Sequence, residues 1–439
     1  MTANLQIFSL LFFMTTVAGL NPALAGYVML AGKAWDAIND PMIGLLSDRT
    51  RSRKWGRRYP WMLWGVFPFG LSFFLLWVVP FKEQTPLFLF YVVVALVFNT
   101  AYTMVNLPYS ALTAEMTSDY DERTSLNGFR FTFSIGGSIF SLIALGVASH
   151  LISDQRQLYF VIGLLFAILS VLPIFWCIWG TYGRTRQAAL VSETHCDMPL
   201  RQQLHVAFSN RPFLLVIGIY LCSWLALQLT ATVIPYYAVS WMGMKTADWP
   251  TVALAVQATA MLTLFVWGWV SARLGKRIVY FLGATLWIMA QAGLFFLQPG
   301  QTSFLYGLAI LAGCGVSTAY LVPWSMLPDV VDLDELNTGH RREGLFYAFM
   351  VFLQKLGLAL ALAGLGQALD WAGFVKSQAG EAAPVQPEAA LMVIRWAIGP
   401  LPTLLLAAGL VLAYLYPISR SVHASILLQL AERKASAST

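Results

Sequence analysis

The amino-acid sequence is dominated by long apolar runs, each close to the length needed to cross a lipid bilayer. A helix of about 20 predominantly apolar residues spans the hydrocarbon core. Twelve such runs follow one another along the 439 residues. They are residues 4–20, 23–47, 59–80, 86–113, 126–152, 158–180, 212–240, 250–272, 277–297, 303–327, 344–370 and 389–417. The sequence therefore predicts an all-α membrane protein with twelve transmembrane helices.

The composition indicates lipid rather than water as the surroundings of this chain. Hydrophobic residues make up 58% and charged residues 11% of it, whereas soluble domains carry about a quarter charged residues. The formal net charge of +6 would suggest a nucleic-acid partner in a soluble protein. Here we expect none, because the basic residues gather in loops between the apolar runs. The first run lacks a basic start and a small-residue cleavage site, so we expect a retained helix rather than a removed signal peptide.

Positive charges in the loops predict the orientation. Cytoplasmic loops of membrane proteins carry an excess of Lys and Arg. With both termini in the cytoplasm, most basic residues fall on that side, including the run from Arg49 to Arg58. The opposite loops then hold only Lys82, Arg156, Lys245 and Lys376. We therefore predict a multi-pass membrane protein with both termini cytoplasmic.

A polar segment divides the chain into halves with six apolar runs each. We expect an N-terminal six-helix bundle (1–180), a cytoplasmic central loop (181–211), a C-terminal six-helix bundle (212–417) and a cytoplasmic tail (418–439). Repeated six-helix units are a feature of secondary transporters. The segment Gly44-Leu45-Leu46-Ser47-Asp48-Arg49 resembles the loop signature of the major facilitator superfamily. That resemblance implies the superfamily's fold.

The second run is unusual because it carries a cluster of polar residues. A charge at the bilayer centre costs about 2.5–3.5 kcal/mol even on insertion scales, so such residues face a cavity or a partner. The members of the cluster are Lys33, Asp36, Asn39 and Asp40. Their helical spacing puts them on neighbouring parts of one helix face. Carboxylate and amide oxygens are ligands that hard cations prefer. A cation or proton site is one interpretation, and an ion-pair network neutralised by Lys33 is the other.

Polar residues also occur in other apolar runs. Thr103, Asn106 and Ser110 lie in the fourth run, Arg130 in the fifth and Lys355 deep in the eleventh. Such residues bind cargo in some membrane proteins and hold helices together in others. Asp48 and Arg49 lie at the inner end of the second run, where we expect a charge network that ties helices together.

Two segments resemble the glycoside–pentoside–hexuronide:cation symporter family, which includes the bacterial melibiose carrier. They are Trp35-Asp36-Ala37-Ile38-Asn39-Asp40-Pro41 and Asn106-Leu107-Pro108-Tyr109-Ser110-Ala111-Leu112-Thr113. The resemblance implies a coupling cation, Na⁺ or H⁺, bound by Asp36, Asn39, Asp40 and Thr103. It also implies cargo contacts from Asn106, Ser110, Arg130 and Lys355, and a basic residue at the position of Lys33. Because the melibiose carrier is bacterial, the resemblance implies a location in the bacterial inner (plasma) membrane.

The chain departs from the melibiose carrier where that protein binds sugar. An aspartate and a tryptophan of its fourth span are Asn106 and Ser110 here. The segment Pro323-Trp324-Ser325-Met326-Leu327-Pro328-Asp329 is similar instead to animal carriers that take up lysophospholipids with sodium. We expect Asp329 to form an inner-loop clasp with Arg341 and Arg342.

The sequence as a whole predicts a secondary active transporter, not an enzyme. The five His residues show no ligand spacing, and we expect no cofactor and no metal beyond the transported cation. The expected function is symport of a sugar or glycoside with Na⁺ or H⁺ by alternating access, with a lysophospholipid or another amphiphile as the alternative cargo. We expect a monomer whose partners are this small molecule, a monovalent cation and the lipid bilayer.

Overall fold

The structure, a computed structural model, describes residues 2–50, 52, 55–56, 58–116, 120–188, 208–338, 343–375 and 384–437. The regular structure of these residues is helical, apart from one isolated bridge between Ser52 and Gly56. The prediction of an all-α protein is therefore confirmed.

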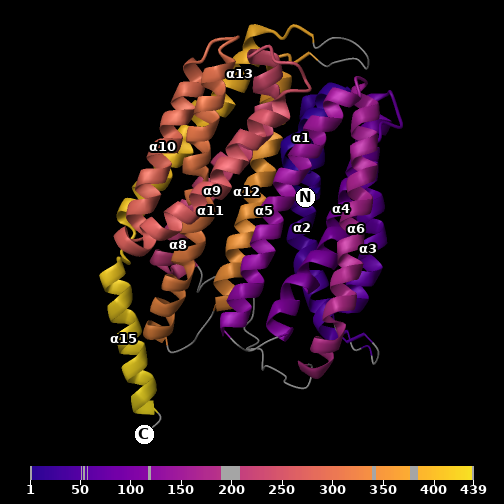
Figure 1. Cartoon of the computed structure of the whole chain (residues 1–439). Helices are drawn as coiled ribbons and strands as arrows, with labels where there is room; N and C mark the ends of the chain where they lie inside the picture. Colours follow the sequence, from indigo (N-terminus) through magenta and orange to yellow (C-terminus); the bar gives the residue numbers. More distant parts are fainter. Residues whose placement is uncertain are drawn as a thin grey trace. The chain divides into compact units, whose positions relative to one another are not determined.

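The helices of the first half of the sequence follow the first six apolar runs (Figure 1). They are α1 (Thr2–Phe12) with its π-helical continuation η1 (Phe13–Val17), α2 (Pro22–Arg49), α3 (Tyr59–Leu75), α4 (Gln84–Met116), α5 (Tyr120–Leu151) and α6 (Gln155–Ala188).

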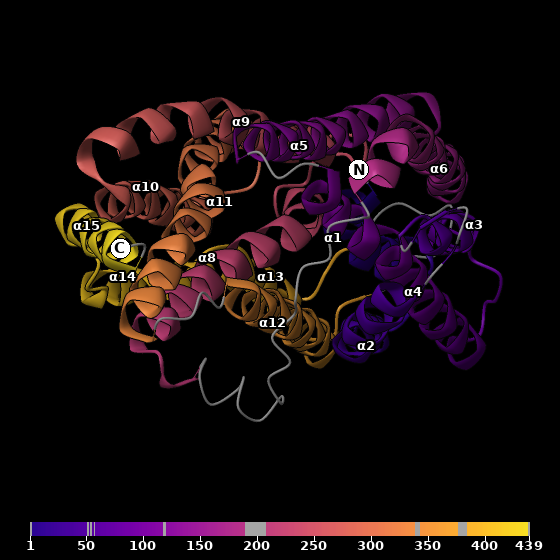
Figure 2. The ribbon, with the colours of Figure 1, turned by 90° about the horizontal axis from the view of Figure 1, so that it is seen from below.

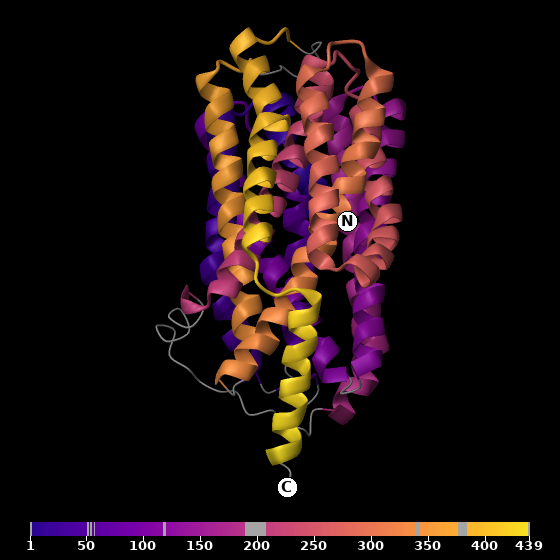
Figure 3. The same cartoon turned by 90° about the vertical axis from the view of Figure 1, so that its left-hand side faces the viewer.

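The helices of the second half follow the remaining runs. They are α8 (Arg211–Tyr236) with the π-helical η2 (Tyr237–Trp241), α9 (Trp249–Leu274), α10 (Lys276–Phe296), α11 (Thr302–Thr338), α12 (Glu343–Trp371), α13 (Glu388–Ile398), α14 (Pro400–Leu415) and α15 (Arg420–Ala437). The last predicted span forms two helices, because Pro400 lacks an N–H group and disfavours a helical conformation of Gly399 before it. The C-terminal helix α15 follows a second break, visible in Figure 3.

Eight of the described helical segments are long and apolar enough to cross a membrane. Three further apolar helices, within α1–η1, α3 and α5, are shorter. Helix α2 belongs to neither group, although it has 28 residues. Its mean hydropathy is lowered by the polar cluster around Asp36, so the helix that carries the predicted cation site is among the less apolar of the predicted spans.

The chain forms two compact units, and the first of them contains segments from both halves of the sequence. The first unit comprises Met1–His195, Ile234–Leu254 and Leu358–Ile394, and the second comprises Cys196–Val233, Ala255–Gly357 and Arg395–Thr439. In the first unit, α4 lies between α2 and α3 (Figure 2) and packs extensively against both. This packing places the polar face of α2 against α4.

Helices α10 and α11 form the most extensive pair of the second unit. Glycines bring their backbones together, since a Cβ atom at Gly315 would lie 2.6 Å from the Gly283 carbonyl oxygen. Small residues at helix interfaces permit such close packing in membrane proteins. Helix α15 also packs on α11 and buries Ile426 and Leu430.

The π-helical segments η1 and η2 end in the same way. After η1, the N–H group of Ala18 donates to the Phe13 carbonyl at 2.8 Å, and Gly19 has a φ of 71°. After η2, the N–H group of Met242 donates to the Tyr237 carbonyl at 3.0 Å, and Gly243 has a φ of 69°. The first helix of each half therefore ends in an equivalent glycine-terminated π turn, which supports the internal repeat expected from the sequence.

The two π-helical ends are joined within the first unit. The hydroxyl groups of Thr15 and Tyr236 lie 2.6 Å apart, and the rings of Phe12 and Tyr236 meet edge to face at 5.2 Å. Two other contacts also join the first half of the sequence to the second half. The Tyr27 hydroxyl donates to Gln367 Oε1 at 3.0 Å, and Asn21 donates to Asp370.

The positive φ of Gly243 predicts a specific cost of substitution. An L-residue in this region of φ/ψ space is destabilised by about 1–2 kcal/mol. Because an added Cβ atom at Gly243 meets nothing within 4 Å, Gly243→Ala tests conformation alone. We expect this variant to lower the melting temperature of the purified protein. Gly268→Ala is the control, since Gly268 lies within α9 and an added Cβ atom there also meets nothing within 4 Å. Equal melting temperatures for the two variants would contradict the assigned turn.

Candidate functional site: a polar cluster between α2 and α4

The candidate cation site lies where α2 packs on α4. Helix α2 begins at Pro22, where the side chain of Asn21 accepts hydrogen bonds from the N–H groups of Ala23 and Leu24. It continues without a break through Pro41, which has no N–H group to donate to the carbonyl of Ala37. One continuous helix therefore holds the whole predicted cluster on the α4 side.

The four predicted cation ligands lie on these two helices. Thr103 Oγ1 of α4 donates to Asp40 Oδ1 of α2 at 2.8 Å. Asp36, Asn39 and Thr103 have relative exposures of 1%, 0% and 2%, and Asp40 is half-buried. The contact between Thr103 and Asp40 connects residues that are 63 positions apart in the sequence.

Asn39 offers a buried oxygen to this cluster. Its Nδ2 atom donates to the backbone carbonyl of Asn99 at 3.5 Å, whereas its Oδ1 atom accepts no hydrogen bond from the residues that the structure describes. A buried polar atom without a partner is costly. An oxygen of this kind beside two carboxylates has the donor chemistry of a site for a hard cation.

Lys33 lies beside Asp36, one of the two carboxylates. Its Nζ atom lies 3.6 Å from Asp36 Oδ2 and 3.3 Å from Asn99 Oδ1. The structure thus contains the ion pair of one interpretation and the oxygen cluster of the other. The two are compatible, because Lys33 contacts Asp36 while Asp40 accepts a hydrogen bond from the neutral hydroxyl of Thr103.

The residues predicted to contact cargo are only partly brought together. Asn106 and Ser110 are half-buried on α4, and the Ser110 hydroxyl donates to the Asn106 backbone carbonyl at 2.7 Å. Lys355 is half-buried on α12 in the second compact unit. The side chain of Arg130 lies outside the described residues. The same holds for the side chains of Asp48, Arg49, Arg341 and Arg342.

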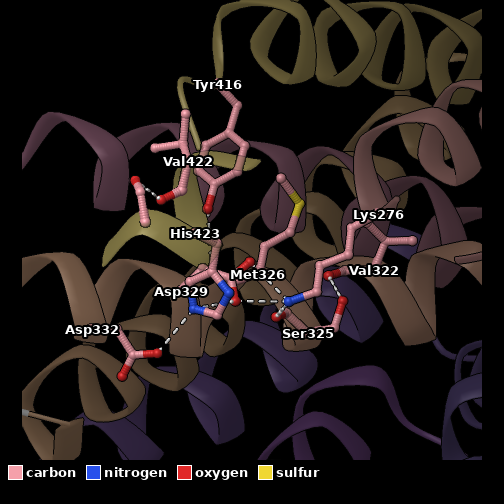
Figure 4. A network of polar contacts seen from close by, with 10 residues as sticks. Lys276, Val322, Ser325, Met326, Asp329, Asp332, Tyr416, Val422 and His423 are labelled. Atoms are coloured by element: carbon pink, nitrogen blue, oxygen red, sulfur yellow. Dashed lines mark hydrogen bonds and ion pairs between the residues drawn. The ribbon is translucent and has the colours of Figure 1, made fainter. Parts of the chain in front are cut away.

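Asp329 of α11 belongs to a polar network with residues near the starts of α10 and α15, shown in Figure 4. Lys276 Nζ lies 2.7 and 2.8 Å from the two carboxylate oxygens of Asp329 and donates to the Ser325 carbonyl at 2.6 Å. His423 Nε2 lies 3.4 Å from Asp329 Oδ1 and 3.0 Å from Asp332 Oδ2. The described partners of Asp329 are therefore Lys276 and His423, whereas the predicted partners Arg341 and Arg342 lie outside the described residues.

Tyr416 borders this network between α14 and α15. Burial raises the pKa of its phenol above the ordinary value, and the negative charge of Asp329 raises it further. The hydroxyl therefore stays protonated and donates to the Met326 carbonyl at 3.5 Å. No sequence signal pointed to Lys276, His423 or Tyr416 as neighbours of Asp329, because the three lie on different helices or loops far apart in the chain.

Within the described residues, no group of three or more His, Cys, Asp and Glu side chains could hold a metal ion. The α2–α4 cluster combines two carboxylates with neutral oxygens and one ammonium group. Such an arrangement suits reversible binding of a monovalent cation better than tight binding of a multivalent metal, because Lys33 already offsets one negative charge.

Comparison with known proteins places the chain in a family. A sequence model described as MFS/sugar transport protein matches residues 1–420. The chain belongs to this family of the major facilitator superfamily. The predicted resemblance to melibiose-carrier-like proteins and the predicted major facilitator fold are thus confirmed.

Several relatives are named as symporters. An uncharacterized symporter of Synechocystis sp. is 47% identical, with 99% of this chain and 94% of that protein covered. The sodium-dependent lysophosphatidylcholine symporter 1-A of Danio rerio is 28% identical, with 94% and 82% covered. Among solved structures, a variant of the nucleoside transporter NupG has a TM-score of 0.60 at 13% identity, with 94% and 98% covered. This last likeness shows the fold alone.

These findings support a transporter that couples cargo to a cation. They also confirm the expectation that the protein is not an enzyme, since the relatives are named as symporters. The apolar helices and the family agree with an integral multi-pass membrane protein.

The contact between Lys276 and Asp329 predicts that substitutions of the two residues have non-additive effects on the melting temperature. Removing one partner of a largely buried ion pair leaves the other charge without compensation. We expect Lys276→Met to lower the melting temperature, and Asp329→Asn in the same chain to restore part of the loss. Lys82→Met, at an exposed loop position, is the control for loss of a lysine charge. Strictly additive effects in this double-mutant cycle would show that the two side chains do not interact.

Proposed function

We propose that the protein is a sodium-coupled symporter whose cation binds at Asp36, Asn39, Asp40 and Thr103. The observation that carries the proposal is the hydrogen bond from Thr103 to Asp40 across the α2–α4 contact, on the same stretch of α2 as buried Asp36 and the buried Asn39 oxygen. Oxygen atoms are the ligands that hard cations prefer. We favour sodium over a proton because of the neutral oxygens of Asn39 and Thr103. These oxygens can coordinate a sodium ion, whereas a proton binds to a carboxylate without them.

The energy available from such coupling is sufficient for accumulation of cargo. One monovalent cation moving down a potential of 100 mV releases about 2.3 kcal/mol, which corresponds to roughly fifty-fold accumulation. Coupling requires that the cation binds one conformation or one loaded form better than another. In the proposed alternating-access cycle, this requirement is met when cargo binds better to the cation-loaded form.

Alternating access also gives a role to the contacts that connect the two halves of the sequence within the first unit. Helices α2 and α12 approach closely there, since a Cβ atom at Gly366 would lie 2.4 Å from the Pro22 carbonyl oxygen. The contacts Thr15–Tyr236 and Tyr27–Gln367 accompany this approach. In the proposed cycle these contacts form in the state that is closed at this end and break in the opposite state.

We propose a single-chain amphiphile, of which a lysophospholipid is the type, as the cargo. Helix α2 carries an exposed apolar track beside its polar cluster, with relative exposures of 62% at Ile38, 43% at Met42 and 45% at Leu46. Such a helix offers charged and apolar surfaces within one turn of each other. The named lysophosphatidylcholine symporters, and Asn106 and Ser110 at positions where the melibiose carrier binds sugar, support the same choice.

Neutralisation of either carboxylate tests the cation site. We expect Asp36→Asn and Asp40→Asn each to abolish stabilisation of the purified protein by Na⁺, because a ligand that binds only the folded form raises its apparent stability. The readout is the melting temperature against NaCl at constant ionic strength held with choline chloride. Glu83→Gln, which removes an exposed loop carboxylate, should keep the response. A normal response in either aspartate variant would refute the assigned site.

The cargo is tested by ligand-induced stabilisation with and without sodium. We expect lysophosphatidylcholine below its micellar concentration to raise the melting temperature, and to do so more strongly in NaCl than in choline chloride. Melibiose and a hexuronide should have no effect in either salt. Stabilisation by either sugar, with none by the lysolipid, would assign the protein to sugar symport instead.

A further inference from the structure

Asn99 of α4 lies beside the proposed cation site and is fixed by three contacts. It is 5% exposed. Its Nδ2 atom donates to the Ala95 carbonyl at 2.8 Å, which directs its Oδ1 atom toward Lys33 Nζ at 3.3 Å. On the α2 side, Gly32 leaves room for the amide, since a Cβ atom there would lie 2.7 Å from Asn99 Nδ2. The amide of Asn99 is thus held in one orientation by its own helix and by α2.

Lys33 has space on the side away from Asp36. A cavity of about 30 Å³ is lined by Gln6, Lys33, Phe98 and Asn99, among other residues. A cavity larger than about 10–15 Å³ with polar partners can hold a water molecule. Gln6, Lys33 and Asn99 are the polar residues of this lining. An ammonium group at the edge of this cavity can therefore remain solvated without closing on a carboxylate.

The distance from Lys33 Nζ to Asp36 Oδ2 shows that the pair is not closed. It is 3.6 Å, whereas charge-assisted N–H···O⁻ hydrogen bonds measure about 2.7–2.9 Å. Asn99 Oδ1 is nearer to the ammonium than Asp36 Oδ2 is. A closed pair would compete with a cation for the same carboxylate, so the position of Lys33 affects how strongly Asp36 binds an external ion.

We propose that Asn99 is a positioning residue that sets the cation affinity by holding the Lys33 ammonium away from Asp36. This inference rests on the proposed function, because it concerns the affinity of the same cation site. Asn99 does not contact the cation in this proposal. It acts through Lys33, and the cavity beside Asn99 is the place to which the ammonium withdraws when a cation occupies the carboxylates.

The direction and size of the effect follow from Coulomb's law. Closing the pair from 3.6 Å to about 2.8 Å strengthens it by an amount equivalent to roughly a tenfold change in competing affinity, at an effective dielectric constant of about 20. Loss of the Asn99 amide should therefore raise the half-saturating Na⁺ concentration about tenfold. A carboxylate at the same position attracts the ammonium and should lower that concentration.

The experiment measures the half-saturating Na⁺ concentration from the thermal stabilisation of the purified full chain without cargo. We expect Asn99→Ala to raise it and Asn99→Asp to lower it. Asn99→Ser provides a second truncation in case Asn99→Ala does not fold. Thr100→Val is the matched control, since it removes a half-buried side-chain hydrogen bond at the neighbouring position, which Thr100 Oγ1 accepts from Trp35 Nε1 at 2.8 Å.

A second background separates positioning from a general structural effect. With Lys33→Met, no ammonium remains to be positioned, so Asn99→Ala should leave the half-saturating Na⁺ concentration of that background unchanged. An equal shift in both backgrounds, or no shift in the native background, would overturn the role of Asn99. Absence of any Na⁺ response in the native protein would instead refute the proposed sodium coupling, which makes the two failures distinguishable.

Discussion

The presence of two carboxylates in α2, one buried and one half-buried, is the constraint on which the rest of the structure depends. Charges inside a membrane are expensive and require a partner or an aqueous cavity. Here Lys33 lies beside Asp36, and Thr103 donates to Asp40. The contact of Thr103 with Asp40, and that of Lys33 with Asn99, need α2 to lie against α4, and α2 packs extensively on α4 along its polar face. The polar cluster thus accounts for the packing of α2 on α4.

Features that depend on local sequence were predictable. The length of an apolar run predicts a helix, and the twelve predicted runs correspond to helices, with one break at Gly399. The periodicity of α2 predicts that Asp36, Asn39 and Asp40 share a face. Partners from distant helices were not predictable without the family resemblance, because they depend on the register between helices. Asn99 beside Lys33 and His423 beside Asp329 are examples.

The halves of the sequence and the compact units describe different properties of the chain. The equivalent π-helical turns at Gly19 and Gly243 follow the sequence repeat. The compact units follow contacts, and the first unit includes segments from both halves. In a carrier that closes at one end, segments of one half must pack on the other at that end. A mixed unit is therefore compatible with six-helix halves that act as the moving parts of the proposed cycle.

The charges of the proposed site determine where a membrane potential can act. With both carboxylates ionised, Asp36, Asp40 and Lys33 have a formal sum of −1, and one bound Na⁺ makes the sum zero. The loaded cluster then reorients without moving net charge, whereas the empty cluster returns with one negative charge. A potential that is negative inside favours return of the empty, negative site toward the outside. On this account the charge of Lys33 is what allows a single monovalent cation to neutralise two aspartates, whereas its position beside Asn99 affects how strongly that cation binds.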